Sequence, residues 1–145
     1  MFKALLVAGG ILNTLFFLFH IMLGYQIFHL GQVAPPYRAF MEALNVGGML
    51  FMFFFAYVSF FHGKDLLGTG LGRTVLVLVS ALYLSRAAEE FFLFKFNFAI
   101  FGSCIVVGAI YAALLVIAIR QRPASPRASG AARPAAKASE LRPAA

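Results

Sequence analysis

Three ionisable residues, Arg86, Glu89 and Glu90, stand close together in a stretch of sequence that is otherwise apolar enough to cross a membrane. Residues three and four apart share one face of a helix, so Arg86 can pair with either carboxylate. Ionised side chains are costly inside a membrane and usually face the interior of a helix bundle. The spacing therefore predicts an inward-facing ion pair with one carboxylate left over.

Polar side chains elsewhere in the sequence fall at a similar depth. Because a helix rises about 1.5 Å per residue, His20, Asn45 and Arg86 are expected in the same half of their respective spans. Glu42 falls nearer the boundary of its span on that side. The agreement in depth predicts one polar pocket in the outer half of the bundle, formed by His20, Asn45, Glu42, Arg86, Glu89 and Glu90.

The charges of this predicted pocket do not balance. If Arg86 pairs with Glu90, the remaining carboxylates have no cation except His20. One carboxylic acid can then stay protonated, because burial and a neighbouring carboxylate both disfavour a second charge. Alternatively, a proton, a metal ion or a cationic ligand completes the balance. A purely structural explanation also stands, in which the ion pair locks the bundle and Glu89 extends to the lipid headgroups.

More specific chemistries find less support. Paired haem ligation is not favoured, because His20 and His29 are nine residues apart and point to opposite sides of one helix. One histidine with a methionine stays open as a haem site. A metal site has suitable donors but lacks the Glu-x-x-His pairing of di-iron bundles. Asp65 falls in a polar loop, so no Ser-His-Asp arrangement is indicated. We assign no metal ligand and no catalytic residue, and any cofactor stays unknown.

The composition predicts an integral membrane protein. Of 145 residues, 62% are hydrophobic and only 12% are charged, which is too little charge to cover a soluble domain. Six of the twelve Lys and Arg residues lie from Arg120 onward, a distribution that suits a tail near anionic lipid rather than a nucleic-acid groove. The single cysteine, Cys104, excludes an internal disulfide and a cysteine-based metal site.

Four apolar stretches are each long enough to cross a bilayer as a helix, which takes about 20 residues. We expect an all-α, four-helix transmembrane bundle over residues 1–122, with spans at about 4–30, 40–61, 71–94 and 98–119. The first stretch is too long for a cleaved signal peptide. Pro35 and Pro36 are expected to end the first helix in an extended turn, and Gly68–Gly72 to form a flexible turn. Residues 123–145, rich in Ala, Pro and Arg, are expected to be disordered.

Small and polar residues recur on one face of three of the spans. Small residues let membrane helices approach closely, since lipid gives them no hydrophobic reason to associate. These faces are therefore expected to point into the bundle, either as packing surfaces or as walls of a site. Their members are Gly10, Asn13, His20, Gly24 and Gly31, then Glu42, Asn45, Met52, Ala56 and Ser59, then Cys104, Gly108, Tyr111 and Ala112.

The loop cations predict the orientation. Lys3, Lys64, Arg73 and the six cations of the tail fall on one side of a four-span bundle, against Arg38 and Lys95 on the other. The positive-inside rule then places both termini in the cytoplasm. We expect a multi-pass protein of the cell membrane, here a bacterial inner membrane.

Three functional hypotheses follow. The first is a non-enzymatic membrane protein that holds a small ligand, a proton or a partner helix in the polar pocket. The second is a small transporter or proton-relay subunit that uses Glu89 and Glu90. The third is a redox subunit that binds haem, quinone or a metal. Expected partners are the lipid bilayer and, for so short a chain, a homo-oligomer or a membrane complex, with no nucleic acid.

Overall fold

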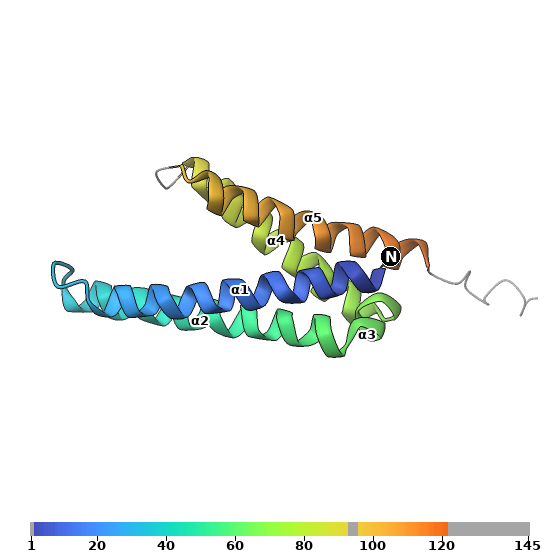
Figure 1. The fold of residues 1–145 in the computed structure, drawn as a ribbon, viewed down its shortest axis with the longest axis horizontal. Coiled ribbons are helices and arrows are strands. Elements are labelled where there is room, and N and C mark those ends of the chain that lie inside the picture. The colour runs from blue at the N-terminus through green and yellow to red at the C-terminus, as the bar shows by residue number, and fades with distance from the viewer. Residues whose placement is uncertain (1, 93–95, 122–145) are drawn as a thin grey trace, which may run out of the picture.

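The structure is a computed structural model that describes residues 2–92 and 96–121. This part of the chain is all helical, as the composition predicts, and contains no strand. The helices, shown in Figure 1, are α1 (Phe2–Phe28), α2 (Pro35–Phe61), α3 (Gly63–Gly68), α4 (Gly70–Phe92) and α5 (Phe98–Arg120).

The long helices form two hairpins. α1 packs along α2, and α4 packs along α5, while the short α3 connects the two pairs. The hairpins lie close together at the end that holds the N-terminus, α3 and the last turn of α5, and they diverge toward the opposite end (Figure 1). The fold is therefore a V of two hairpins rather than a parallel-sided bundle.

The buried core lies where the hairpins converge. Fully buried apolar side chains from three of the long helices meet there: Phe55, Leu76, Val79, Val107 and Leu114. Many large apolar side chains on the outer faces are instead exposed, among them Phe53, Leu50 and Leu71. An apolar exterior of this extent is unfavourable in water and is what contact with lipid requires.

Three helices, α1, α2 and α5, are long and apolar enough to cross a membrane. α4 has the same 23-residue length as α5, but its sequence carries Arg73 and the Arg86 ion-pair region. The described helices therefore support a multi-pass membrane protein, with α4 distinguished from the others by its charges.

The start of α2 differs from the prediction. Pro35 and Pro36 occupy its first turn instead of forming an extended turn after α1, which ends at Phe28. The first residues of a helix have no partner for their N–H groups, so the missing N–H of proline costs nothing there, and its fixed φ suits the helix. The second helix thus begins five residues before the predicted residue 40.

The turn predicted over Gly68–Gly72 is shorter than expected, because helices occupy all of this range except Thr69. α3 ends at Gly68 and α4 begins at Gly70, with Thr69 at the corner. The Thr69 hydroxyl donates to the Asp65 carbonyl oxygen at 2.8 Å and accepts from the Gly72 backbone N–H at 2.9 Å. This one side chain therefore closes α3 and caps the beginning of α4, which fixes the connection between the hairpins.

The last helix matches its predicted range of 98–119 closely. Asn97 is its N-cap, since its side-chain oxygen accepts from the backbone N–H groups of Ala99 and Ile100 at 3.0 and 3.3 Å. Lys95, the end of the third predicted span and the predicted tail at 123–145 lie outside the described residues.

Candidate functional site

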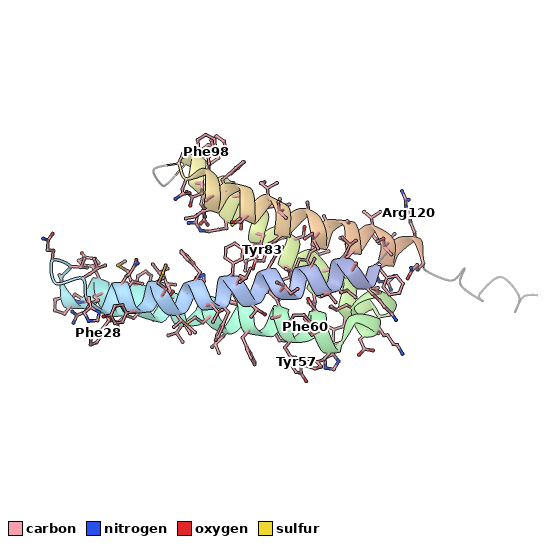
Figure 2. All side chains as sticks on the ribbon, viewed as in Figure 1. Phe28, Tyr57, Phe60, Tyr83, Phe98 and Arg120 are labelled. Carbon is pink, nitrogen blue, oxygen red and sulfur yellow. The ribbon has the colours of Figure 1, made fainter. Side chains whose placement is uncertain are left out.

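A cleft of about 830 Å³ lies between the two hairpins. All four long helices contribute to its walls, which are formed largely by Leu, Phe and Ile side chains. Figure 2 shows Tyr83 between the hairpins near their convergence, whereas Phe28 and Phe98 mark the diverging ends. The polar side chains on the cleft walls are His20, Tyr83, Ser85, Arg86, Glu89 and Ser103.

One guanidinium lies between two carboxylates on α4. Arg86 Nη2 lies 2.6 Å from Glu90 Oε1, and Arg86 Nη1 lies 3.7 Å from Glu89 Oε2. The Glu90 side chain is only 2% exposed, whereas that of Glu89 is 44% exposed and lines the cleft. The inner carboxylate therefore holds the arginine, and the outer one faces the cleft.

His20 is held on the opposite wall by Asn45. The Asn45 side-chain amide donates from Nδ2 to the His20 carbonyl oxygen at 2.9 Å, which turns Oδ1 toward His20 Nδ1, also at 2.9 Å. Because Oδ1 is an acceptor, Nδ1 must carry the proton in this contact. In the neutral ring the other nitrogen, Nε2, is then an acceptor with a lone pair.

Two glycines leave the space that this pair needs. A Cβ on Gly24 would lie 2.8 Å from Asn45 Nδ2, and a Cβ on Gly48 would lie 2.9 Å from His20 Cε1. The histidine ring thus packs directly on the backbone of α2, which fixes its orientation toward the cleft. Asn45 itself is buried and does not line the cleft; it holds His20 through the two hydrogen bonds described above.

The six predicted pocket residues fall into three groups. His20, Arg86 and Glu89 share the cleft. Asn45 and Glu90 are buried beside them and hold their side chains through the contacts described above. Glu42 lies elsewhere, because it extends from the α2 surface toward Arg38, with Arg38 Nε 3.9 Å from Glu42 Oε1 and both side chains exposed.

A buried hydrogen-bond network at the convergence of the hairpins was not predicted from the sequence. Tyr83 donates to Asn13 Oδ1 at 2.7 Å, and Asn13 Nδ2 donates to the Tyr111 hydroxyl at 2.8 Å. The Tyr111 hydroxyl also lies 2.6 Å from the Ser59 hydroxyl. The network thus connects one side chain from each long helix, and Tyr83 forms part of the cleft floor.

The sequence contained a partial signal for this network. Asn13, Ser59 and Tyr111 all lie on the inward-facing stripes of small and polar residues, but Tyr83 lies on a span with no such stripe. Polar groups away from water need internal partners, so four such residues at one level are expected to bond together. Their pairing depends on how the hairpins dock, which helical periodicity alone does not specify.

The three histidines lie at different levels. His20 lines the cleft, His29 contacts the Tyr25 carbonyl oxygen just beyond the end of α1, and His62 pairs with Asp65 at the other end of the molecule. Within residues 2–92 and 96–121, no group of three or more His, Cys, Asp or Glu side chains is arranged to hold a metal ion.

Comparison of the chain with protein-family models, with curated proteins and with solved structures finds no match.

Proposed function

We propose that this chain is a four-span membrane protein that binds a small amphiphilic molecule in the cleft between its hairpins. The observation that supports the proposal is the composition of the cleft walls, where a few polar groups converge on an otherwise apolar surface. Ligand sites typically have volumes of about 300–1,000 Å³ and this balance of apolar walls and oriented polar groups. The cleft volume of about 830 Å³ falls within that range.

The distribution of charge supports α4 as the fourth span. Arg86 and Glu89 face the cleft and Glu90 is buried, so the ionised groups in the second half of α4 avoid the lipid-facing surface.

The distribution of Lys and Arg residues between the two ends of the molecule supports the orientation. Lys3, Lys64, Arg73 and Arg120 lie in α1, α3, α4 and α5 at the end where the hairpins converge (Figure 1), and Arg38 lies at the other end.

In this orientation both termini are cytoplasmic, and the hairpins diverge in the outer half of the bilayer. The cleft then opens among lipid chains, from which an amphiphilic molecule can enter with its apolar part first. A bacterial inner membrane is the setting that we propose for this arrangement.

The proton-relay alternative has weaker support. Glu90 is bound to Arg86 at 2.6 Å, so it is held as one half of an ion pair. The hydrogen-bond network beyond the cleft floor passes through the amide of Asn13, which does not exchange protons as a hydroxyl or carboxyl group does. The Arg86–Glu90 ion pair and the hydrogen bonds of Asn13 therefore support ligand binding better than proton transfer.

The test is ligand-dependent stabilisation of the purified protein in lipid nanodiscs. A ligand that binds only the folded state raises its melting temperature. We would measure this shift with three amphiphiles that share a dodecyl chain: dodecylamine, dodecanol and laurate. At least one of them should stabilise the chain in a saturable manner.

A matched pair of variants tests whether the cleft is the site. Ser103→Phe places a ring inside the cleft, whereas Ile105→Phe places the same ring on the exposed side of the same helix. Stabilisation should be lost in Ser103→Phe and retained in Ile105→Phe. The absence of stabilisation by all three amphiphiles, or its retention in Ser103→Phe, would refute the proposal.

A further inference from the structure

The hydroxyl donors on the cleft walls are already used within the chain, and the Arg86 guanidinium, which also borders the cleft, lies between Glu90 and Glu89. The Ser85 hydroxyl donates to the Leu82 carbonyl oxygen at 2.9 Å, and the Ser103 hydroxyl donates to the Ile100 carbonyl oxygen at 2.9 Å. The Tyr83 hydroxyl donates to the buried network. A ligand whose polar group only accepts hydrogen bonds would therefore have to displace one of these internal contacts.

The acceptors, in contrast, are available from two opposite walls. On α1, His20 Nδ1 is engaged by Asn45, and Nε2 has no hydrogen-bond partner in the part of the chain that the structure describes. On α4, the half-exposed carboxylate of Glu89 lies 3.7 Å from Arg86, a longer contact than the 2.6 Å between Arg86 and Glu90. Both groups can accept hydrogen bonds from a molecule placed between them.

The charge around the cleft favours a cation. Two carboxylates surround one guanidinium, so the group carries a net negative charge when all three are ionised. Among the described residues, neither α2 nor α5 adds a charged side chain to the walls, and the other titratable groups that border them are His20, Tyr83 and Cys104. A charge within apolar walls is screened much less than in water, so this imbalance has a strong effect on a bound ligand.

We infer that the ligand of this cleft is a lipophilic amine bound in its ammonium form, with its N–H groups directed to Glu89 and to His20 Nε2. This inference rests on the binding role proposed above and specifies the chemical class of the ligand. The apolar body of the amine occupies the Leu- and Phe-lined walls. An alkyl amine resembles a lysine side chain, which is protonated at neutral pH.

Other headgroups satisfy the cleft less well. A fatty acid would place a carboxylate beside Glu89 and opposite a lone pair, and the Arg86 guanidinium that attracts an anion is already shared by Glu90 and Glu89. A quaternary ammonium supplies the charge but has no N–H to donate. A fatty alcohol supplies one donor without a charge. The inference therefore predicts the order dodecylamine, then dodecyltrimethylammonium and dodecanol, then laurate.

The decisive measurement is the affinity of these four amphiphiles for the protein in nanodiscs, in the wild type and in Glu89→Gln. Because a hydrogen bond to a charged group contributes about 1.5–3 kcal/mol, the loss of this charge should weaken dodecylamine binding by about tenfold or more. Dodecanol binding should change far less. Glu89 is half exposed, so the variant is expected to fold, which its melting temperature without ligand verifies.

A second pair of variants tests whether His20 takes part in binding, without replacing His20 itself. Gly48→Ala would push on the His20 ring, whereas a Cβ on Gly47 meets no atom within 4 Å. Dodecylamine binding should weaken in Gly48→Ala and stay unchanged in Gly47→Ala.

The outcomes separate the two proposals. If laurate binds most tightly, or if all headgroups bind equally, the amine inference is wrong while the binding role stands. If Glu89→Gln leaves the preference for dodecylamine intact, the inference is also wrong. If no amphiphile binds, both the inference and the proposed function fail.

Discussion

Glu90 is a buried carboxylate, and burial makes its charge energetically costly. Its carboxylate is 2% exposed, and an ionised group removed from water is stable only when it is paired. Arg86 provides that pairing at 2.6 Å from one turn earlier on the same helix. The outer carboxylate, Glu89, shares the same arginine at a longer distance and remains accessible from the cleft.

The first prediction concerns the difference in burial between Glu90 and Glu89. Arg86→Leu leaves Glu90 buried without its partner and should lower the free energy of unfolding by about 3–5 kcal/mol. Glu90→Leu should cost less, because Arg86 retains Glu89. The double variant Arg86→Leu, Glu90→Leu should recover most of the loss, since it leaves no unpaired charge in the buried position of Glu90. Unfolding in mixed detergent micelles measures all three, and a double variant as unstable as Arg86→Leu would show that the pair has another structural role.

The sequence predicted this ion pair but not the network around Tyr83. The contact between Arg86 and Glu90 is local, so helical spacing is sufficient to predict it. The common depth of His20 and Arg86 followed from counting residues along each span, and both lie on the cleft. The bond from Tyr83 to Asn13 depends on the relative rotation of two helices, which a single sequence does not specify. Glu42 was misplaced because depth does not determine which side of a helix a residue occupies.

At the scale of the elements, two polar features join the hairpins in addition to the apolar core. The corner at Thr69 connects α3 to α4 along the chain, and the buried network connects all four long helices across the convergence. Interhelical hydrogen bonds in membranes each contribute only about 0.6 kcal/mol on average, so the network orients the hairpins more than it stabilises them. The close packing of the corner is the stronger constraint.

The second prediction tests the corner. A Cβ on Gly72 would overlap the Asp65 carbonyl oxygen and lie 2.5 Å from Leu66 Cα, both of which are backbone atoms that cannot rotate away. Gly72→Ala should therefore destabilise the fold by about 1–3 kcal/mol, the usual cost of overpacking. A Cβ on Gly70, two residues earlier, meets no atom within 4 Å, so Gly70→Ala should be neutral or slightly stabilising. Equal stability of the two variants would show that α3 does not pack on α4 in this way.

The sequence predicted the helical elements more successfully than their junctions. Apolar length was sufficient to find the long helices, because lipid requires continuous apolar segments whose backbone is satisfied internally. Pro35 and the Gly68–Gly72 segment were misinterpreted because the same residues begin helices as well as interrupt them. For Gly68–Gly72, the contacts of Thr69 and Gly72 with α3 show that α4 begins within this segment.

At the scale of the whole molecule, the V shape gives the two ends different roles. The converging end contains the core, the corner and most of the cationic helix termini, whereas the diverging end contains the cleft. In the proposed orientation the cytoplasmic half is the rigid part of the protein and the outer half is the part that receives a ligand. This division depends on α4 crossing the membrane despite its charges.

The last prediction tests that crossing. Gln32 lies in the exposed turn between α1 and α2, and Gln121 follows α5 at the opposite end. In a chain with Cys104→Ser, which removes the single native cysteine, Gln32→Cys and Gln121→Cys can each be labelled with a membrane-impermeant maleimide. With four spans and cytoplasmic termini, intact spheroplasts should label Gln32→Cys, and Gln121→Cys should react only after permeabilisation. If α4 does not cross, three spans place the two positions on the same side, so labelling of both in intact spheroplasts would exclude α4 as a span. Labelling of Gln121→Cys alone would instead reverse the orientation and move the cleft to the cytoplasmic half.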